Sequence, residues 1–545
     1  MVDKKEIKRY VLDNAISYKG RANLKAVVGH MIGKHPELKE DMKKFMEEIH
    51  KIVKDINSKS IKKQREELEK LGKVEKVKKK EAGLFDFFGI KKEKIVTAFP
   101  PGPEKYPHIG HSKALLLNYL LAKEYDGKFI LRFEDTNPEL VEKKFYDIML
   151  DNFSWLGVKW DELQYASDYM DIFHDYGKKL IEKGLAYVCF CKRDKIKENR
   201  RNGTSCKCRD IDGTQNLRNW IDFFEAKKGS SIVRLKIDMK HKNAVMRDPT
   251  IFRIITKEHP RTKKQYRVWP TYEFQNSIMD GYFGVTHRLR GKEFEAMAEL
   301  QKYIQNLFGL TVTNTYEFAR FNMKGILSSG RIIREKIKKK QLAGWGDPRL
   351  TTLVALRRRG FLPEAIKDFV VSTGISKSEG TLTWDDLIVK NRRLVDDVAN
   401  RYFFIEKPKK IEILNFEGKD VDVPLHPDHL ERGVRKLKVK NDFYIADVIK
   451  RNKNYRFMHL FNFMNGKFIS EGLDKKLDAK LIHWLPVSKD LAKVRILMDN
   501  GKFISGVAES GVKKLKVGDV IQFERFGFCK LDKKGKELEF IFTHR

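Results

Sequence analysis

The stretch between residues 94 and 138 carries the pattern that most limits the fold of this chain. It reads as an apolar strand in "KIVTAF", a loop rich in proline and glycine, an apolar helical segment over about 111–125, and a second apolar strand in "GKFILRFEDTNP". A strand, a crossover helix and a further strand in so short a stretch predict a βαβ unit, and therefore a parallel sheet. Ligands of such sheets bind beyond the carboxyl ends of the strands. Both His108 and Glu134 fall at such ends.

Two histidines, His108 and His111, flank Ile109 and Gly110 where the first strand gives way to the helix. A glycine there lets the backbone approach a ligand closely, and the start of a helix offers free N–H groups and a positive dipole end to phosphate. Imidazole N–H groups can also donate to phosphate oxygens and stabilise developing charge. The pattern indicates a phosphate site. The simpler alternative is that one histidine caps the helix and the other lies on the surface.

The N-terminal part of the chain, up to about residue 72, favours helices. In "ELKEDMKKFMEEIHKIVKDI" the apolar residues recur three and four positions apart, which is typical of an amphipathic helix. The residues of this apolar face are Met42, Phe45, Met46, Ile49, Ile52 and Val53. The charged stretch 73–94 that follows is interpreted as a linker.

Beyond the βαβ unit the pattern of apolar and polar residues changes several times. Over 268–294 apolar segments alternate with polar ends, which indicates that the sheet resumes there. Residues 346 to about 404 favour helices. From about residue 405 onward, short β-rich segments separated by Gly, Asn and Asp are typical of β-barrels.

The net charge of the chain is +36, with 111 basic residues against 75 acidic ones. Such an excess is the electrostatic signature of nucleic-acid binding, because a polyanion neutralises it. A composition adapted to heat is the alternative, but it would add both signs. No apolar run approaches the ~18 residues of a membrane span, and the N-terminus is charged, so we expect a soluble cytoplasmic protein without membrane contact.

Four cysteines form the pattern C-x-C, fourteen residues, C-x-C, at Cys189, Cys191, Cys206 and Cys208. Four thiolates in paired spacing suit tetrahedral Zn²⁺ in a structural role, because a closed Cys₄ site leaves no open position for catalysis. A knuckle without metal is the alternative. The remaining cysteine, Cys529, is expected in a β-barrel core.

Several motifs, taken in order, resemble one enzyme family. The strand, the Pro-rich loop, "PHIGH", the helix and "LRFEDTNP" are similar to the nucleotide-binding fold of class I aminoacyl-tRNA synthetases. "GKFILRFEDTNP" narrows the resemblance to the glutamyl and glutaminyl enzymes. "GWGDPRL", "ALRRRGFLPEAIKDFV" and "VGDVIQFERFGF" narrow it to the archaeal-type glutamyl enzymes. The resemblance runs from about residue 94 to the end of the chain.

The resemblance implies a multidomain α/β plus β architecture with a Rossmann-like catalytic domain. The expected order is an N-terminal helical appendage and linker (1–92), the first catalytic half (93–167), an acceptor-binding insertion with the Cys₄ site (168–267), the second catalytic half (268–320), a signature loop and helical connecting domain (321–404), and anticodon-binding β-barrels (405–545).

The resemblance also assigns roles to individual residues. The phosphates of ATP would be held by His108, Gly110 and His111. Glu134 would bind the ammonium group of the amino acid. The pocket for this amino acid would be lined by Tyr272 and Asn276. Arg290 matches a position that is arginine in glutamyl enzymes and a smaller neutral residue in glutaminyl ones. A guanidinium there pairs with a side-chain carboxylate and rejects an amide. The alternatives are ordinary sheet residues at Tyr272 and Asn276, and a surface ion pair at Arg290.

Three positions depart from the family pattern. Ala98 stands where the family has arginine, and Gly102 stands where it has an acidic residue or asparagine. The second signature reads "ILSSGRIIREK" (326–336) and lacks its phosphate-binding lysine, so its ATP-binding candidates are Ser328, Ser329 and Arg331. Arginine binds phosphate well. Ala98 has no evident replacement in the sequence, which keeps a catalytically weak tRNA-binding paralogue as an alternative.

The implied function is ATP- and Mg²⁺-dependent attachment of glutamate to tRNA(Glu) through a glutamyl-adenylate. The implied partners are glutamate and tRNA(Glu), with tRNA(Gln) as a second candidate substrate and a protein as a candidate partner for the N-terminal helices. A glutaminyl-tRNA synthetase remains an alternative. The candidate tRNA-phosphate contacts are Arg349, Arg357, Arg358 and Arg359, for which a solvated basic face is the simpler reading.

Overall fold

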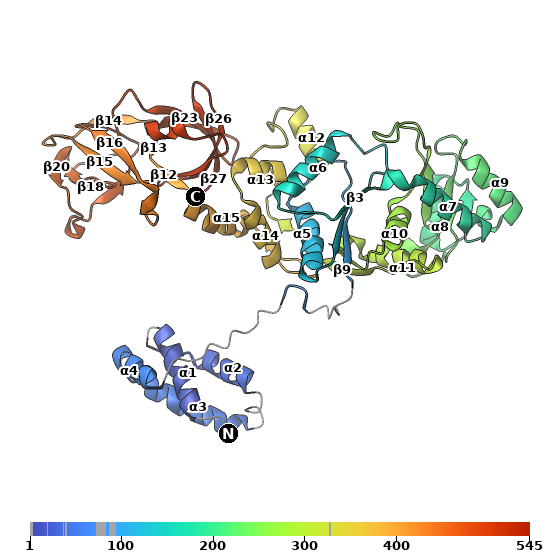
Figure 1. Cartoon of the computed structure of the whole chain (residues 1–545), viewed down its shortest axis with the longest axis horizontal. Helices are drawn as coiled ribbons and strands as arrows, with labels where there is room; N and C mark the ends of the chain where they lie inside the picture. The colour runs from blue at the N-terminus through green and yellow to red at the C-terminus, as the bar shows by residue number, and fades with distance from the viewer. Residues whose placement is uncertain are drawn as a thin grey trace. The chain divides into compact units, whose positions relative to one another are not determined.

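The computed structural model describes residues 4–18, 20–35, 38, 41–71, 83–86, 94–325, 327 and 329–545. The chain divides into two compact units, Met1–Asp86 and Phe87–Arg545 (Figure 1). Most of the charged stretch interpreted as a linker lies outside the described residues.

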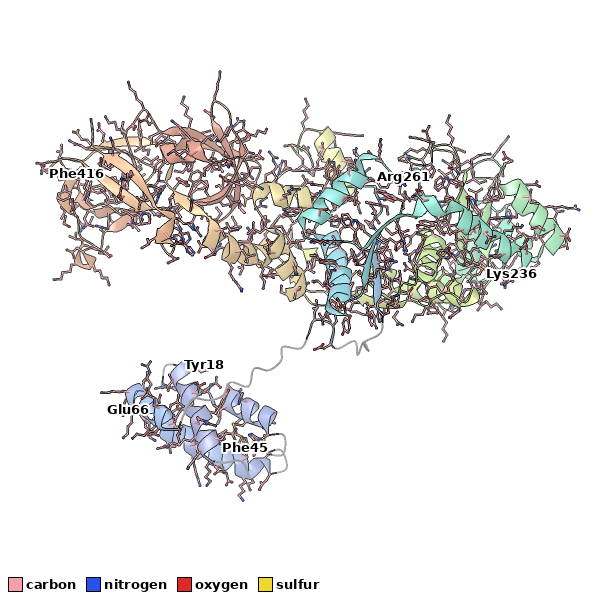
Figure 2. All side chains as sticks on the ribbon, in the orientation of Figure 1. Tyr18, Phe45, Glu66, Lys236, Arg261 and Phe416 are labelled. Carbon is pink, nitrogen blue, oxygen red and sulfur yellow. The ribbon has the colours of Figure 1, made fainter. Side chains whose placement is uncertain are left out.

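The first unit is helical, as predicted. Its helices are α1 (Lys4–Ser17), α2 (Leu24–Lys34), α3 (Met42–Asn57) and α4 (Ile61–Leu71). The predicted apolar face of α3 is confirmed for Phe45, Ile49 and Val53, which are buried in the core of the bundle (Phe45 is labelled in Figure 2). Met42 is exposed instead. Asp41 starts α3, because its carboxylate accepts a hydrogen bond from the Lys44 N–H over 3.2 Å.

The second unit is built around a parallel sheet. Its strand order is β3-β2-β1-β8-β9, with β1 at Val96–Phe99, β2 at Lys128–Phe133, β3 at Glu162–Tyr165, β8 at His287–Gly291 and β9 at Asn314–Phe318. All neighbouring strands are parallel. The central strand β1 is buried throughout, as expected for a strand covered on both faces. Helix α5 (Ile109–Glu124) connects β1 to β2, which confirms the predicted βαβ unit.

Helices cover both faces of this sheet. On one face the Thr97 hydroxyl donates to the Asn118 carbonyl of α5 over 2.9 Å. On the other face, α10 (Tyr272–Tyr282) receives hydrogen bonds from arginines of β2 and β8. The remaining helices of this part are α6 (Lys144–Trp155) and α11 (Ala298–Leu307).

The segment 268–294 differs from the expected resumption of the sheet. Only β8 belongs to the parallel sheet, because Val268–Pro270 forms β7 of a different sheet and α10 lies between them. Residues 274–281 of α10 are all buried, so their burial does not follow the alternation of a strand with one exposed face.

The insertion is an antiparallel sheet with three helices. Its strands are β4 (Ala186–Cys189), β5 (Ile232–Leu235), β6 (Thr250–Ile254) and β7, and its helices are α7 (Met170–Glu182), α8 (Arg193–Asn202) and α9 (Gly213–Phe223). A hairpin of the insertion is anchored to the edge of the parallel sheet. There Arg261 (Figure 2) pairs with Asp168 over 2.8 Å and its guanidinium carbon lies 3.6 Å from the ring centroid of Tyr165.

The connecting region is helical, as predicted. It contains α12 (Gly330–Lys338), α13 (Leu353–Arg359), α14 (Pro363–Ser372) and α15 (Trp384–Val398), with a short strand pair, β10 (Asn322–Met323) and β11 (Thr381–Leu382). Proline at the first position of α14 suits a helix start. Left-handed Gly360 ends α13, with a φ of 95°.

The C-terminal region is a β structure in two parts. The strands are β12 (Asn400–Tyr402), β13 (Phe404–Glu406), β14 (Lys409–Glu412), β15 (Lys419–Pro424), β16 (Val434–Val439), β17 (Asp442–Ile445), β18 (Asn454–Phe457), β19 (Asn462–Met464), β20 (Lys467–Ser470), β21 (Lys480–Ile482), β22 (Leu485–Pro486), β23 (Ala492–Leu497), β24 (Phe503–Ala508), β25 (Val520–Phe523), β26 (Gly527–Lys533) and β27 (Leu538–His544).

The larger part is a seven-stranded sheet of order β12-β25-β26-β27-β23-β24-β13. Its two edge strands follow each other directly in the chain, so the sheet nearly closes on itself. Cys529 is fully buried in its core, as expected. The strands from β14 to β22 pack around a second core that contains Phe416 (Figure 2) and Trp484. The predicted α/β architecture with a C-terminal β region is confirmed. Among the described helices none is both long and apolar enough to cross a membrane.

Candidate active site

Both signature histidines cap the start of α5. The Nδ1 atom of His108 accepts from the Gly110 N–H over 3.0 Å, and the Nδ1 atom of His111 accepts from the His108 N–H over 3.1 Å. A Cβ on Gly110 would lie 2.8 Å from the His108 ring, so only glycine fits beside the capping ring. The two rings lie 4.0 Å apart between centroids. Capping by histidine is therefore real, and it involves both residues rather than one.

Capping sets the proton positions on these rings. A backbone N–H can only donate, so each Nδ1 atom must be unprotonated, and a neutral imidazole then carries its proton on Nε2. Burial lowers the pKa of His108 to about 4, with a further contribution from Lys105. Burial also lowers the pKa of His111 well below its ordinary value. Both rings are neutral at neutral pH, and each has an Nε2–H group that can donate to a ligand.

The first backbone N–H groups of α5 are not free, which differs from the expectation of an open helix start. The Ile109 N–H donates to the Thr351 carbonyl over 3.0 Å, and the His111 N–H donates to the His108 carbonyl over 2.8 Å. With the Gly110 N–H bound to the His108 ring, the backbone has internal partners here. A phosphate at this end of the sheet would therefore meet imidazole Nε2–H groups and side-chain cations rather than the backbone.

A narrow pocket joins the His108 region to the second signature. It is lined by Lys105, Tyr106, His108, Leu327, Gly330, Ile333, Trp345, Thr351 and Thr352. Ser329 starts α12 without a side-chain cap, and Ser328 lies outside the described residues. Arg331 is 88% exposed and pairs with Glu335 over 3.4 Å. Lys105 lies nearer to the pocket, since its Cδ atom is 3.7 Å from the position of a Cβ on Gly330.

Glu134 lies just beyond the end of β2 in a buried network of charges. Arg132 donates to Glu134 over 3.3 Å and to Asp280 of α10 over 2.7 Å. Asp280 also accepts from Arg288 of β8 and, over 2.8 Å, from Gln301 of α11. Burial raises the pKa of Glu134 to about 7, although the neighbouring guanidinium groups oppose this. The Oε2 atom of Glu134 is buried without a hydrogen-bond partner among the described residues.

Arg290 lies on the same strand as Arg288. Its Nη1 donates to Gln301 over 3.1 Å, and its Nε lies 3.9 Å from the Glu317 carboxylate, which is bound more closely by Lys377 at 3.3 Å. The Nε and Nη2 atoms of Arg290 are buried and have no hydrogen-bond partner in the described part of the chain. Arg290 is thus a buried guanidinium with donors to spare, and not the surface ion pair considered as the alternative.

Tyr272 and Asn276 belong to α10 and face the same network. The Asn276 side-chain oxygen accepts from Arg132 over 3.2 Å and from Arg288 over 3.1 Å. Burial raises the pKa of Tyr272 to about 12, and Glu134 contributes to this shift, so the phenol is a neutral donor beside that carboxylate. The structure therefore brings together all four residues expected at the amino-acid pocket, although two of them lie on a helix instead of a strand.

The four clustered cysteines lie at the end of β4 and around the turn that follows α8. Their sulfur atoms all lie within 4.8 Å of one another, and the Cys189 and Cys206 Sγ atoms are 3.9 Å apart. Ligands 2.3 Å from a tetrahedral Zn²⁺ ion would have sulfurs about 3.8 Å apart. The donor set and its spacing fit zinc.

The four candidate tRNA-binding arginines are engaged within the protein. Arg349 pairs with Asp347 over 2.7 Å, Arg357 with Asp151 over 2.8 Å, and Arg358 with Asp532 of β26 over 2.6 Å. Arg359 is 3% exposed and donates to the Thr543 carbonyl of β27 over 2.7 Å. Arg358 and Arg359 thus tie α13 to the C-terminal sheet, and the tRNA contacts stay a prediction.

Sequence reasoning missed five members of the buried network that includes Glu134 and Arg290, and one cation that lines the pocket beside His108. They are Arg132, Asp280, Arg288, Gln301, Glu317 and Lys105. A signal was available for three of them, because Arg132 follows the apolar run of β2, Arg288 alternates with Leu289 in a short strand, and Asp280 follows Ile278 and Met279. A charge at a buried position requires a partner.

Residues 94–396 match the model of the catalytic domain of class I tRNA synthetases (E and Q), and residues 399–481 and 481–532 match two models of the anti-codon binding domain of the same synthetases.

Among curated proteins, the chain is similar to the glutamate–tRNA ligase of Methanothermobacter thermautotrophicus, with 38% identity over 98% of this chain and 98% of that protein. It is 38% identical to the glutamate–tRNA ligase of Pyrococcus abyssi over 98% of this chain and 99% of that protein. It is 40% identical to that of Methanocaldococcus jannaschii over 96% and 97%. The chain belongs to the family of class I tRNA synthetases for glutamate and glutamine.

Proposed function

We propose that this chain is a glutamate–tRNA ligase, which attaches glutamate to tRNA(Glu) through a glutamyl-adenylate. The observation that carries the proposal is Arg290, a buried guanidinium whose Nε and Nη2 atoms have no hydrogen-bond partner among the described residues. It shares a network with Glu134, whose Oε2 atom is equally unpartnered. A glutamate molecule offers a side-chain carboxylate to the first and an ammonium group to the second.

The first half-reaction needs groups that orient ATP. Family membership implies ATP with Mg²⁺. The Nε2–H groups of His108 and His111 would donate to phosphate oxygens, while Lys105 and Arg331 supply positive charge. An oxygen of the α-carboxylate of glutamate attacks the α-phosphorus of ATP and pyrophosphate leaves. Because the attacking group is already an anion, no general base is required, and catalysis is positioning and charge stabilisation.

The second half-reaction transfers the glutamyl group to tRNA. The terminal ribose 2′-OH attacks the carbonyl carbon of the adenylate, AMP leaves as its phosphate anion, and the hydroxyl proton passes to solvent or to that phosphate. The tRNA would be held along the β region, whose residues 399–532 match models of anti-codon binding domains. We expect tRNA to be bound before activation proceeds.

Specificity for glutamate over glutamine rests on Arg290 in this proposal. A glutamine amide would leave the guanidinium charge unmatched in a buried site, which is costly. Exchange of pyrophosphate into ATP, with tRNA present, tests this directly. We expect exchange with glutamate and not with glutamine. The reverse pattern would make the chain a glutaminyl enzyme, and exchange with neither at ordinary enzyme rates would favour a weakly catalytic tRNA-binding paralogue.

A structural Zn²⁺ ion would be held in the insertion by four cysteines, Cys189, Cys191, Cys206 and Cys208. The support is the sulfur spacing and the four-sulfur donor set, which leave no coordination position for a substrate. The ion would cross-link the end of β4 to the turn after α8. In that place it would stiffen the part of the chain expected to meet the acceptor end of tRNA.

Several finer points remain proposals. The domain boundaries given above, charging of tRNA(Gln) as well as tRNA(Glu), a protein partner for the N-terminal helices and a cytoplasmic location all rest on the sequence. Side-by-side charging of purified tRNA(Glu) and tRNA(Gln) tests whether tRNA(Gln) is a substrate, since activity on tRNA(Glu) alone would exclude it.

A further inference from the structure

Three arginines lie on one face of the parallel sheet, the face covered by α10. They are Arg132 of β2, and Arg288 and Arg290 of β8. Side chains alternate between the two faces of a strand, so residues 288 and 290 share a face. Arg132 and Arg288 both reach Asp280 of α10 from strands on either side of β1.

The central strand contributes only a methyl group at this place. Thr97 is in register with His287, so the next pair along β1 and β8 is Ala98 beside Arg288. Paired residues of parallel strands point to the same face. Ala98 is fully buried and packs with Ile130 and Val285. Its small side chain leaves room for the two guanidinium groups that converge over the middle of the sheet.

One donor of the Arg288 guanidinium has no hydrogen-bond partner in the described part of the protein. Arg288 is 2% exposed, its Nη2 donates to Asn276 over 3.1 Å and to Asp280, and its Nε is buried without a partner among the described residues. Asp280 also accepts hydrogen bonds from Arg132 and Gln301. Buried polar atoms normally have hydrogen-bond partners. Here several buried donors without such a partner among the described residues belong to arginines that meet at Asp280 and Gln301. They are Arg132 Nη1, Arg288 Nε, and Arg290 Nε and Nη2.

The excess of donors indicates a ligand with more than one acceptor group. We infer that Arg288 is a second substrate-binding guanidinium, which binds a carboxylate of glutamate alongside Arg290; this inference rests on the proposed function. The two arginines are two residues apart on one strand, about 7 Å along it. That spacing suits an amino acid with a carboxylate at each end of a short chain. Arg288 also lies near enough to Glu134 to oppose the rise that burial causes in the pKa of that carboxyl.

The test is the Michaelis constant for glutamate in the full-length Arg288→Met variant. We expect KM for glutamate to rise at least tenfold, with KM for ATP and for tRNA within twofold of the unsubstituted protein. The loss of Arg288 leaves Asp280 paired with Arg132 and Gln301, so the network keeps its acid satisfied. If the Met variant unfolds, Arg288→Lys decides, because it keeps the charge but loses the planar fork, and we expect an intermediate rise in KM.

A swap of the two neighbouring positions separates binding from a merely structural role. In the double variant Ala98→Arg, Arg288→Ala, the guanidinium starts from the adjacent strand and faces the same pocket. We expect it to recover most of the glutamate affinity that Arg288→Ala loses. Ala98→Arg alone should be impaired, because two long side chains would then compete for the space above Ala98.

The outcomes for the two proposals are distinct. An unsubstituted protein that charges no glutamate would overturn the proposed function. An unsubstituted protein that charges glutamate normally, combined with an unchanged glutamate KM in Arg288→Met, would overturn only the role of Arg288. So would a folded Arg288→Met variant in which kcat alone falls, or a swap that restores nothing. If Arg288→Met does raise the glutamate KM, inhibition of this variant by glutamine tells which carboxylate Arg288 binds, because glutamine lacks the side-chain charge.

Discussion

The ring of His111 accepts a hydrogen bond from the backbone N–H of His108, over 3.1 Å, and so closes a reciprocal cap at the start of α5. The capping bonds use the Nδ1 atoms, and the Nε2–H groups remain for a ligand. Structure and chemistry are thus divided between the two nitrogens of each ring, and substitutions can separate them.

Replacement of His108 by asparagine should remove the chemistry and keep the cap. Asparagine is a good N-cap residue, so the thermal unfolding midpoint should stay close to that of the unsubstituted protein. The adenylation rate should fall roughly 100-fold, because one preorganised donor is lost. His108→Ala is the matched control and should cost about 1 kcal/mol of stability in addition. Equal stability losses in both variants would contradict the division of roles.

The kcat/KM for glutamate should fall as the pH drops below about 7. Burial raises the pKa of Glu134 to about 7, so below that pH the free enzyme carries a neutral carboxyl that attracts the substrate ammonium weakly. Because kcat/KM reports the groups of the free enzyme, a pH profile in the presence of saturating ATP shows this limb. The profile of Glu134→Gln should lack it. The pKa of His108, lowered to about 4 by burial, lies too far down to produce the same limb.

Arg290→Ala should raise the KM for glutamate strongly, roughly 100-fold, because a charge-assisted bond in a buried site is lost. The affinity for tRNA should stay nearly unchanged, since Arg290 is buried and offers almost no surface to a macromolecule. Charging kinetics and a tRNA-binding titration measure the two quantities. Equal losses in both would show that Arg290 acts on folding and not on substrate.

Lys105 and Arg331 are the two cations whose contributions near His108 can be compared by substitution. Lys105 lines the pocket beside His108, whereas the side chain of Arg331 is largely exposed and paired with Glu335. Lys105→Met should therefore lower the rate of pyrophosphate exchange about tenfold, and Arg331→Met should change it less than Lys105→Met does. A larger loss in Arg331→Met would mean that the second signature moves to bring Arg331 onto the phosphates when ATP binds.

Zinc analysis of the purified full-length protein should find one ion per chain. Cys206→Ser should remove it, because a thiolate ligand is lost, and should lower the unfolding midpoint of the insertion. Cys529→Ser is the control, since Cys529 is buried in the C-terminal sheet far along the chain and should leave the zinc content intact. A metal-free protein that charges tRNA normally would remove the zinc proposal.

Much of the architecture could be predicted because it depends on local spacing. The amphipathic face of α3, the βαβ unit around His108 and the paired cysteines are each a pattern within a few tens of residues. Hydrophobic period and capping residues are read from neighbours in the chain. The segment 268–294 was harder, because its short apolar groups fit a strand or a helix, and burial against the sheet decided for α10.

The sequence by itself determined most of the elements outside 268–294 and the family resemblance. It also identified His108, Glu134, Tyr272, Asn276 and Arg290 as site candidates. Only the tertiary structure decided which charges meet. Arg132, Asp280 and Arg288 are far apart in the chain, and their convergence over Ala98 depends on the order and register of β2, β1 and β8 and on the helix laid across them. The hydrophobic pattern of a strand decides which of its faces is buried, but the pattern within one strand does not name the distant strands that become its neighbours. Position 98, where the family pattern has arginine, holds a buried alanine, and the register of β1 and β8 places Arg288 beside it on the adjacent strand.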